Sequence, residues 1–559
     1  FPIRLYVAKI DTAVLGVRFL AANHIVYNAT DNSLYHKKLN EIRKGDSYTY
    51  DGRTFITNGQ PSESSSGQST STESNTSSRT DIQHSGLRQI IEEYDEKMKI
   101  VGNGWVENDI FHKIRTTGTP VKFKARPLKP DKLAAAKEEF DKLLKAGIIR
   151  ESTSEWATPI HCVPKKNGKI RITGDFRFLN KQTVKDAFCP PNMRSFNSAL
   201  HGATVFSCID IEKAYYHIRT HPEDVEKTAT ITPFGKFEWV RMPMGLSNSS
   251  QTWSRFMAQI LQGCKFAFNY LDDVLIYSKT EKEHLEHLKV IMSKLATHGL
   301  KINFEKTEFL KNEVRFLGFC IDKDGIRPPD DKKKQLSESE RPATVKQLRT
   351  FLGAFNFYRT HMPKAADVTQ RMNALMTGKK NDRTPINWTP ELLSDFSDAI
   401  DQIRHAKKLA HPDPAAQLYI NCRTTDSCMG AELRQKTTTG CHTTVGFFSK
   451  GFNKTQRNWD NLSKELFTVK EALKFWFCYA DGMPIHIVTP SQEVAQIIAG
   501  KTPILVKKHI RWNLFITQLT TSVEVRGTPA MRPSKTPLRP SPQKAGKLSR
   551  SNRHTGNAL

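Results

Sequence analysis

Apolar residues recur along the chain in two spacings, one typical of helices and one typical of buried strands. Segment 130–147 predicts an amphipathic helix, because its apolar side chains return every three or four residues. These side chains are Leu133, Ala136, Phe140, Leu143 and Leu144. Gly147 follows the last of them, and glycine commonly ends a helix. One face of this helix is therefore suited to packing on a core.

Three β-rich runs carry polar residues where their strands end. Segment 158–183 predicts a hairpin with a Lys-Lys-Asn-Gly tip, although a plain hairpin with solvated lysines has the same pattern. An apolar strand runs directly into Asp210. Segment 265–278 holds two apolar strands with Asp272 and Asp273 between them.

Two segments are too polar to pack. Residues 59–83 are rich in serine and threonine, which predicts a linker. Residues 527–559 hold seven Lys or Arg, no acid and five prolines, which predicts a disordered tail. This tail is either a nucleic-acid-binding arm or sequence without a folded role, and we favour the second.

The charge balance indicates a long polyanionic partner. The chain of 559 residues has a formal net charge of +27 and a pI of about 9.6, with Lys and Arg spread along it. Such a distribution favours nucleic acid over a single phosphate pocket, although charge alone equally allows a merely soluble basic protein. The length allows several domains.

Membrane and secretory signals are not found. No uninterrupted apolar run approaches the ~20 residues that span a bilayer, so we expect no membrane partner. The nine cysteines are scattered without metal-binding spacing, as expected of reduced thiols. Because the chain starts at Phe1 without a convincing signal peptide, we expect it to be a fragment of a longer protein.

Asp272 and Asp273 must be either solvated or neutralised, because an unpaired carboxylate in apolar surroundings is strongly disfavoured. An exposed hairpin tip would solvate both acids, and aspartate is common in turns. A divalent metal site would neutralise them instead. Asp210 strengthens the second interpretation, because two-metal phosphoryl transfer needs about three carboxylates from separate strands around ions ~3.5 to 4 Å apart.

Six motifs follow one another in a fixed order. They are KKNGKIRITGDFRFLN, FSCIDIEKAY, FEWVRMPMGLSNSSQTWSRFM, YLDDVLIYS, GLKINFEKTEFL and VRFLGFCIDKDGI. Together they resemble the reverse transcriptases of Ty3/gypsy-type long-terminal-repeat retrotransposons, over residues 120 to 525. The resemblance implies an α+β multidomain fold, in which a right-hand polymerase of fingers, palm and thumb is followed by a ribonuclease H-like α/β domain.

The resemblance also implies a role for each matched residue. The metal-binding carboxylates, which would hold two Mg²⁺ ions or Mn²⁺ in their place, are Asp210, Asp272 and Asp273. Lys306 would protonate the leaving pyrophosphate, although a surface lysine is an equally economical interpretation. The residues expected to contact the incoming dNTP are Lys165 or Lys166, Arg171, Tyr215, Met244 and Gly245. The residues expected to grip the primer end are Leu317 and Gly318.

Tyr215 and Gly245 would each shape the site of the incoming nucleotide. Tyr215 would exclude a ribose 2′-OH and so select deoxynucleotides, with a core tyrosine as the alternative. Gly245 would let the backbone approach the nascent base pair, where a side chain would intrude. The family usually has phenylalanine where this chain has Met244.

Segment 386–494 resembles the family's ribonuclease H domain but departs from its catalytic pattern. Alignment on GAELRQ places Arg423 where the first aspartate is expected, and Pro490 stands where another is expected. Glu465 is retained, and Asp426 is three residues out of register. An arginine would add positive charge where two cations should bind, so we predict the fold without RNA cleavage.

The N-terminal stretch AVLGVRFLAANHIVYNATDNSLYH resembles the end of a retroviral-type aspartic protease. Asp11 lies in IDTA, which mimics that family's active-site motif, but it directly precedes a segment that should follow much later. We therefore interpret Asp11 as a loop residue. The expected domains are a protease remnant (1–45), a linker (46–83), fingers and palm (84–330), thumb or connection (331–400), a degenerate ribonuclease H-like domain (401–526) and a basic tail (527–559).

The function implied is RNA-directed DNA polymerisation, with dNTPs and an RNA or DNA primer-template as partners. The alternative is a decayed retroelement copy that keeps the fold and only binds nucleic acid. Membership of a larger Gag-Pol polyprotein, homodimerisation and a cytoplasmic virus-like particle are further implications of the resemblance.

Overall fold

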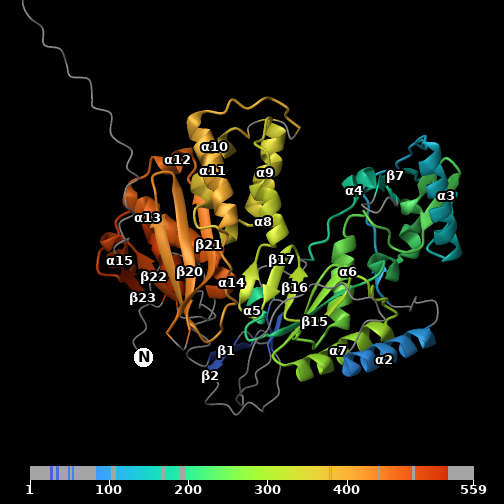
Figure 1. The fold of residues 1–559 in the computed structure, drawn as a ribbon, viewed down its shortest axis with the longest axis horizontal. Coiled ribbons are helices and arrows are strands. Elements are labelled where there is room, and N and C mark those ends of the chain that lie inside the picture. Colours follow the sequence, from blue (N-terminus) through green and yellow to red (C-terminus); the bar gives the residue numbers. More distant parts are fainter. Residues whose placement is uncertain are drawn as a thin grey trace, which may run out of the picture.

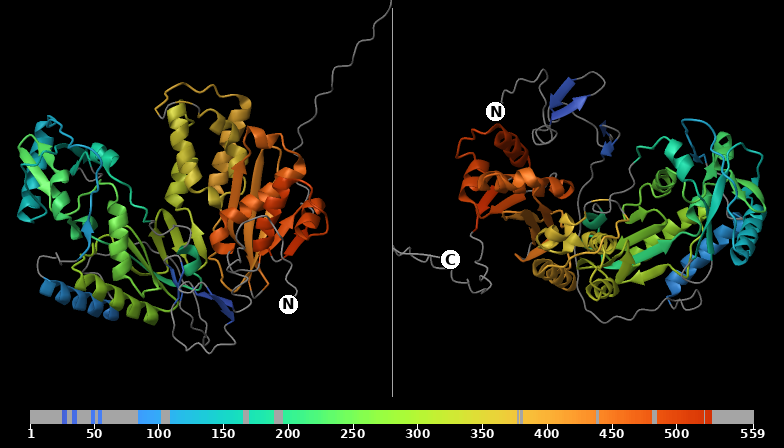
Figure 2. Two further views of the ribbon diagram at one scale, coloured as in Figure 1. Left: turned by 180° about the vertical axis from the view of Figure 1, so that it is seen from behind. Right: turned by 90° about the horizontal axis from the view of Figure 1, so that it is seen from above.

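A computed structural model gives the fold of the chain (Figures 1 and 2). The residues it describes are 25–28, 33–36, 48–50, 53–55, 84–101, 109–164, 170–188, 196–376, 378, 381–437, 440–480, 485–520 and 522–526. Asp11, Lys165, Lys166 and the predicted tail lie outside these residues. Within the described part, no helix is long and apolar enough to cross a membrane.

Two short hairpins precede the main body. Their strands are β1 (Ile25–Asn28), β2 (Ser33–His36), β3 (Tyr48–Tyr50) and β4 (Arg53–Phe55). The second hairpin lies inside the range 46–83 that we expected to be a linker throughout. Its Tyr, Thr and Phe residues favour strands, which explains the difference.

The first sheet supports the predicted amphipathic helix. Its strands, in spatial order, are β6 (Ile149–Glu151), β12 (Gly235–Trp239), β11 (Thr230–Thr232), β7 (Thr158–Pro164) and β8 (Ile170–Gly174). Helix α3 (Pro130–Lys145) packs on it through Phe140, which is 1% exposed. Gly147 follows with a φ of +65°, a conformation in which glycine is least strained.

The central sheet is covered by helices on one side. Its strands, in spatial order, are β13 (Ala267–Tyr270), β14 (Asp273–Ser278), β9 (Val205–Asp210) and β15 (Glu308–Lys311). The helices are α2 (Ser85–Val101), α6 (Ser249–Ile260) and α7 (Glu281–Thr297). Tyr94 fixes α2 in place, because its hydroxyl donates to Leu300 O (2.8 Å) and accepts from Ile302 N (3.0 Å).

Short elements connect these two sheets. They are β5 (Phe111–His112), α4 (Arg177–Gln182), α5 (Phe196–Ala199), η1 (Ala214–His217), β10 (Arg219–Thr220) and η2 (Pro222–Thr228). The two-residue strands β5 and β10 pair in parallel.

A three-stranded hairpin sheet leads into a group of helices. The strands are β16 (Glu313–Phe316), β17 (Phe319–Asp322) and β18 (Gly325–Arg327), and the helices are α8 (Asp330–Ser337), α9 (Val345–Phe357), η3 (Arg359–His361), α10 (Ala365–Ala374) and α11 (Pro390–Arg404). Thr344 and Gln347 form a capping box that starts α9. Helix α11 runs across residue 400, where we expected a domain boundary.

The C-terminal sheet has mixed strand directions. Its strands, in spatial order, are β21 (His442–Gly451), β20 (Cys428–Lys436), β19 (Gln417–Thr424), β22 (Ile485–Thr489) and β23 (Ser522–Val525), the last three being parallel. Its helices are α12 (Lys454–Arg457), α13 (Asn461–Phe475), α14 (Phe477–Ala480), α15 (Gln492–Ile498) and α16 (Lys507–Leu519). Helix α13 packs on β19 and β20.

The hairpin sheet and the segment before the C-terminal sheet are joined by backbone hydrogen bonds. Ile326 N donates to Leu409 O (2.8 Å), and Leu409 N donates to Ile326 O (2.9 Å). Gly325 permits this approach, since a Cβ there would overlap the carbonyl group of Leu409. Lys408 adds an ion pair with Asp322 (2.6 Å). We call this contact the β18 joint.

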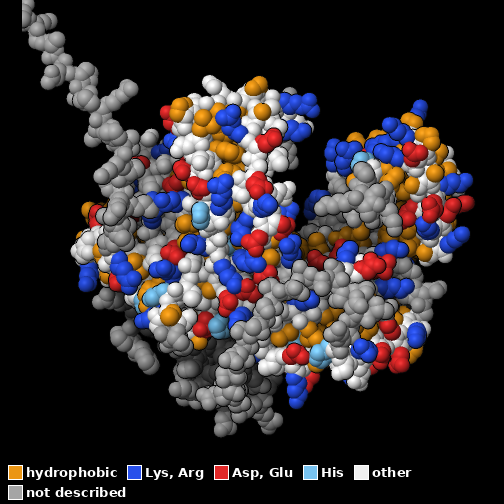
Figure 3. All heavy atoms as spheres, viewed as in Figure 1, with side chains coloured by type: hydrophobic (Ala, Val, Ile, Leu, Met, Phe, Trp, Pro, Cys, Tyr) orange, Lys and Arg blue, Asp and Glu red, His pale blue; other side chains and the backbone are white. Residues whose placement is uncertain are grey.

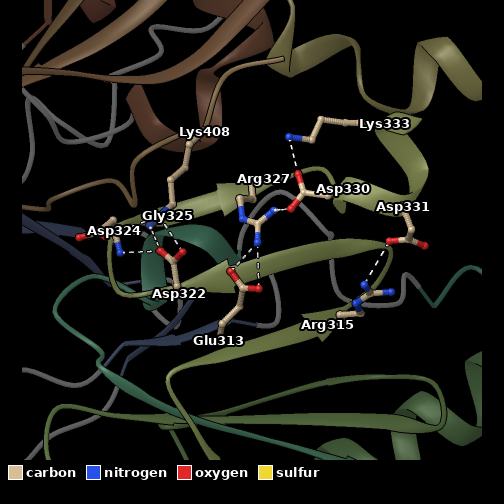
Figure 4. Close-up of polar contacts among 10 residues, drawn as sticks. All are labelled: Glu313, Arg315, Asp322, Asp324, Gly325, Arg327, Asp330, Asp331, Lys333 and Lys408. Carbon is tan, nitrogen blue, oxygen red and sulfur yellow. Dashed lines mark hydrogen bonds and ion pairs between the residues drawn. The ribbon is translucent and has the colours of Figure 1, made fainter. Parts of the chain in front are cut away.

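Ion pairs surround the β18 joint (Figure 4). Arg327 bonds both carboxylate oxygens of Glu313 (3.0 and 2.9 Å) and pairs with Asp330 (2.7 Å). Asp330 also pairs with Lys333, and Arg315 pairs with Asp331. These contacts attach the first turn of α8 to the hairpin sheet.

Candidate functional site

Asp210 and Asp273 stand opposite each other on neighbouring strands. Asp210 ends β9, Asp273 begins β14, and the antiparallel register pairs the two residues. Cross-strand partners point to the same face of a sheet, with Cβ atoms roughly 4.5–5.5 Å apart. Burial raises the pKa of Asp273 and the charge of Asp210 raises it further, whereas the charge of Lys306 lowers it. A nearby cation therefore favours the ionised pair.

Asp272 lies in the tight turn between β13 and β14. Leu271 has a left-handed φ of 54°, and its carbonyl accepts hydrogen bonds from Trp253 Nε1 (2.6 Å) and Asn269 Nδ2 (2.9 Å). Ile211 N donates to Asp272 O (3.0 Å), which ties the turn to the end of β9. Sequence reasoning missed both residues: Trp253 is brought to this turn by the tertiary structure, whereas Asn269 lies in the same hairpin, just before Leu271.

Lys306 lies beside the first of the acids. Its Nζ is 3.1 Å from Asp210 Oδ2, and its side chain is 68% exposed. The segment before β15 also holds Asp210 through the backbone, because Asn303 N donates to Asp210 O (2.8 Å) and Asp210 N donates to Thr307 Oγ1 (3.2 Å). Lys306 thus supplies positive charge beside the acidic pair of Asp210 and Asp273.

A cavity of about 840 Å³ lies between α3, β8 and the residues after β9. The predicted site residues that line it are Asp210, Asp272, Met244 and Lys306. Further lining residues from the palm side include Lys213, Ala214, Tyr216, Pro243 and Asn303. Predicted polymerase positions that are not among these lining residues include Asp273, Tyr215, Gly245, Leu317 and Gly318.

The two adjacent tyrosines of η1 belong to different cores. Tyr215 packs among the buried residues of the central sheet, with its ring edge-on to Trp253 (6.2 Å) and its hydroxyl 3.4 Å from Ser250 Oγ. Burial raises the pKa of Tyr215. Tyr216 packs against the core of the first sheet, stacked on Trp239 (6.0 Å, 23° between planes).

Gly245 has a φ of +94°, in a loop held by Asn180. Asn180 Nδ2 donates to Gly245 O (2.8 Å), and its Oδ1 accepts from Ser247 N (2.7 Å). A Cβ on Gly245 would meet Phe176 at 3.8 Å, which is ordinary contact. The positive φ, rather than crowding within the chain, therefore accounts for glycine here.

Leu317 and Gly318 form the two-residue turn between β16 and β17. Both have positive φ, 50° and 83°, as a type I′ hairpin turn requires. Tyr358 at the end of α9 donates its hydroxyl to Gly318 O (3.1 Å), and the Phe357 ring lies 3.3 Å from a Cβ built on Gly318. The turn is thus held against α9.

Arg171 lies on β8 opposite Val163, and its side chain is outside the described residues. Asp175 follows this strand and is paired with Arg177 (2.6 Å) and Arg126 (2.6 Å). Those two arginines hold the pKa of Asp175 far below its usual range, despite an opposing effect of burial. Asp175 therefore anchors the base of the hairpin.

The C-terminal sheet places the remaining predicted residues apart. Glu465 is half-buried on α13, Asp426 is exposed in the turn after β19, and Pro490 is exposed after β22. Thr424 donates to Thr468 Oγ1 of α13 (2.9 Å). Since neighbouring strand residues point to opposite faces, the exposed Arg423 points away from α13.

We predict no RNA cleavage because Arg423 would add positive charge where two cations should bind. Arg423 is exposed near the end of β19, and Glu465 is half-buried on α13. Within the described residues, no three His, Cys, Asp or Glu side chains gather closely enough to hold a metal ion.

The same criterion applies to the central sheet. The donor set of Asp210, Asp272 and Asp273 consists only of carboxylate oxygens, which is the chemistry that Mg²⁺ prefers. The residue types therefore fit Mg²⁺, and binding requires the three carboxylates to draw closer than they lie here.

Two regions of the chain, one of which contains these carboxylates, match known protein families. Residues 163–321 match the family model described as "Reverse transcriptase (RNA-dependent DNA polymerase)". These residues belong to the reverse transcriptase family. The reverse transcriptase region is followed, at residues 388–487, by a match to "RNase H-like domain found in reverse transcriptase". Both parts of the predicted resemblance are thereby confirmed.

Relatives of this reverse transcriptase region are transposon polyproteins. The chain is 31% identical over 404 residues to the Transposon Tf2-3 polyprotein of Schizosaccharomyces pombe, covering 72% of this chain and 30% of the polyprotein. The Transposon Tf2-7 polyprotein of the same organism matches with the same identity and coverage. The chain thus spans 30% of the length of these curated relatives.

Solved structures confirm the predicted fold. The foamy viral protease-reverse transcriptase dRH in complex with double-stranded DNA has a TM-score of 0.69 and 23% identity, covering 81% of this chain and 80% of that chain. The foamy viral protease-reverse transcriptase in complex with double-stranded DNA has a TM-score of 0.67 and 24% identity, covering 80% and 93%. At these identities the likeness concerns the fold alone.

Proposed function

We propose that the chain is an RNA-directed DNA polymerase, which adds deoxynucleotides to a primer on an RNA or DNA template. The observation that carries this proposal is the acidic pair of Asp210 and Asp273, next to Asp272 and a cavity, inside a reverse transcriptase domain. All three carboxylates lie at the joined ends of β9 and β14. The arrangement suits transfer of a nucleotidyl group.

The three carboxylates would hold two Mg²⁺ ions. Bound there, the ions would lower the pKa of the attacking hydroxyl and stabilise charge on the phosphoryl oxygens. The chain's own part is to position the backbone that carries the acids. Trp253 and Asn269 fix the turn that carries Asp272, and Asn303 fixes the backbone of Asp210.

Lys306 would act on the leaving group. Its ammonium lies at the cavity next to Asp210, where pyrophosphate would depart. A positioned acid of this kind commonly contributes 10²–10⁴-fold to rate, which is the order of magnitude we expect of Lys306. Arg171, which lies on β8, would contact the triphosphate.

The turn at Leu317 and Gly318 would position the primer end. It is part of a hairpin held by the Tyr358 hydroxyl at the end of α9, within the group of helices α8 to α11. Figure 3 shows the molecule hollowed between these helices and the lobe of α3, with Lys and Arg side chains on both sides. Such a basic border suits a nucleic acid backbone, and binding there would weaken as salt rises.

Nucleic acid as the partner has two further supports. The net charge of the chain is +27. The foamy viral proteins of similar fold were solved in complex with double-stranded DNA and with an RNA/DNA hybrid. We propose the same classes of partner here, within a longer polyprotein of a retrotransposon.

A second candidate is a decayed copy that binds nucleic acid without turnover. Arg423 and Pro490, in place of two expected aspartates, favour it for the C-terminal domain, while the acids of the central sheet favour the polymerase. Primer extension on an RNA template by the full chain, with Mg²⁺ and dNTPs, distinguishes the two. Extension abolished by Asp272→Asn and Asp273→Asn supports polymerisation, and salt-sensitive binding without extension supports the relic.

A further inference from the structure

One buried histidine connects the two strands that carry the acidic pair. His284, near the start of α7, is fully buried. Its Nε2 lies 2.8 Å from Ser207 Oγ on β9, and its Nδ1 lies 2.8 Å from Ser278 Oγ on β14. We call these three residues the serine–histidine bridge. It joins β9 to β14 on the face of the central sheet that α7 covers.

The bridge and the acidic pair lie on opposite faces of this sheet. Side chains alternate between the faces along a strand, so Ser207, three residues before Asp210, points to the other face. In the same way, Ser278 is five residues after Asp273 and points away from it. The bridge can therefore act on the acids only through the position of the strands.

The bridge satisfies a neutral imidazole completely. Burial lowers the pKa of His284 to about 4, so near pH 7 the ring carries one N–H and one unprotonated nitrogen. A serine hydroxyl can donate or accept, so each nitrogen finds a suitable partner in either tautomer. Ser207 Oγ also accepts from Leu310 N (3.0 Å), and Ser278 Oγ also contacts His287 Nδ1 (2.7 Å). The network is thus fully bonded, as a buried polar group requires.

The register of β9 and β14 needs a determinant beyond apolar packing. A shift by two residues would keep every side chain on its own face of the sheet. On the α7 side, Ile209 would then stand opposite Ile276 rather than Val274, which is an equally apolar partner. The shift would also separate Asp210 from Asp273, whose direct opposition costs stability. Apolar packing therefore does not select the observed register, and the charges oppose it.

The bridge fits the observed register alone. Ser207 stands opposite Ile276, so Ser278 is its diagonal neighbour. Diagonal side chains in a sheet lie roughly 7–8 Å apart, and directly opposite ones roughly 4.5–5.5 Å. Two hydrogen bonds of 2.8 Å with a ring between them suit the longer separation and exceed the shorter one. A shift by two residues would set the serines directly opposite each other or, in the other direction, move them out of reach.

We propose that His284 is a positioning residue of the polymerase, which holds β9 and β14 in the register that sets Asp210 opposite Asp273. This inference rests on the proposed polymerase function and adds a determinant of the geometry of its acids. Buried polar groups are known to specify register in other folds, at some cost in stability.

A double-mutant cycle on the full chain tests the bridge. The variants are His284→Leu, Ser207→Ala and the two combined. His284→Leu removes the bridge but leaves neither serine without a partner, because each keeps its second contact. His361→Leu is the matched control, since His361 is also a buried histidine that is hydrogen-bonded, to Lys407 O (2.8 Å), but it lies in η3.

The readouts are kcat for primer extension, the Mg²⁺ concentration at half-maximal rate, the Kd for primer-template and the melting temperature. We expect His284→Leu and Ser207→Ala each to lower kcat by about tenfold to a hundredfold, because small misplacements of catalytic groups have effects of this size. Each should also raise the Mg²⁺ requirement and leave the Kd for primer-template unchanged. The double variant should lose no more than the weaker single variant, because both changes remove the same bridge. His361→Leu should lower the melting temperature and leave kcat unchanged.

Hydrogen–deuterium exchange of the full chain gives a readout that needs no turnover. Amides of β9 and β14 should exchange faster in His284→Leu than in wild type, whereas those of β19 and β20 should be unchanged. Full kcat in folded His284→Leu, additive losses in the double variant, or unchanged exchange in β9 and β14 would each overturn the inference while the polymerase function stands. If wild type does not extend a primer, the polymerase function fails and so does the catalytic role of His284. The exchange measurement then still decides whether the bridge holds the register.

Discussion

Asp210 and Asp273 are direct cross-strand partners, one at the last residue of β9 and the other at the first residue of β14. Like charges placed opposite each other in a sheet are destabilising. The sequence therefore keeps a pair that costs stability, as expected where function requires both acids.

Replacement of one acid should separate activity from stability. We expect Asp273→Asn to lower primer extension by roughly a hundredfold to a thousandfold, because it removes an electrostatic contact to the reacting centre. Its melting temperature without metal should equal or exceed that of wild type, because the repulsion with Asp210 is gone. Asp141→Asn on the exposed side of α3 is the matched control. A clear loss of stability in Asp273→Asn would contradict this interpretation.

Lys306 should act as an acid rather than as a charge alone. A proton donor to pyrophosphate cannot be replaced by arginine, whose guanidinium does not deprotonate in proteins. We therefore expect Lys306→Arg and Lys306→Gln to lose kcat to a similar extent, about a hundredfold or more. The control is Lys282→Gln on the exposed surface of α7. Retention of most activity in Lys306→Arg would mean that charge beside Asp210 is sufficient.

Gly325 and Gly353 form a contrasting pair for stability. A Cβ on Gly325 would overlap Leu409 at the β18 joint, in a backbone conformation with φ +148°. We expect Gly325→Ala to destabilise the chain by more than about 2 kcal/mol, measured by denaturant unfolding. Gly353, inside α9, has nothing within 4 Å of an added Cβ. Gly353→Ala should therefore stabilise, by about 0.5–1 kcal/mol.

The C-terminal domain should not degrade RNA in an RNA/DNA hybrid with Mg²⁺. A double variant of this domain tests the orientation of its residues. Arg423→Asp with Pro490→Asp restores the expected residue types in sequence, yet Arg423 lies on the strand face away from α13 and Glu465. We expect this double variant to remain inactive in a gel assay of labelled hybrid. Mg²⁺-dependent cleavage by either wild type or the double variant would refute the prediction.

Buried histidines should make stability depend on pH. His284 is 0% exposed, bonded to Ser207 (2.8 Å) and Ser278 (2.8 Å), and burial lowers its pKa to about 4. The unfolded chain takes up this proton near pH 6.5 and the folded chain only near pH 4. The contribution to the free energy of unfolding is therefore full above pH 6.5 and falls between those values, by about 3 kcal/mol in total.

Denaturant unfolding between pH 7.5 and 5 checks this window. His284→Asn should reduce the slope of stability against pH, and exposed His405→Asn should leave it unchanged. Burial also lowers the pKa of His112 and of His361 to about 4, so part of the slope should persist in the variant. An unchanged slope in His284→Asn would exclude its contribution.

The sequence predicted best the positions of helices and strands, which depend on the backbone and not on side-chain direction. The helix at 130–147 and the strands around Asp210 and Asp273 follow from apolar spacing, because a buried face must recur with the period of its element. These acids are brought together by strand pairing, which the motif order already implied.

Side-chain direction was harder to predict. Tyr215 matches the family position by counting, but the structure shows that it and Tyr216 pack against different cores. Arg423 matches by counting as well, and the alternation of β19 decides its face. Trp253, which holds the Leu271 turn, is placed there by tertiary packing, which no local pattern encodes.

The β18 joint limits which segments recombination between retroelements could exchange without loss of the fold. Leu409 precedes the C-terminal sheet in sequence, yet its backbone is paired to Ile326 of the hairpin sheet. A crossover between two retroelements at residues 400–410 would place a foreign segment against this strand. The product would keep its fold only if the incoming segment could make the same two hydrogen bonds and accept a glycine-sized gap. Modular exchange of the ribonuclease H-like domain is therefore constrained by a strand edge in its neighbour.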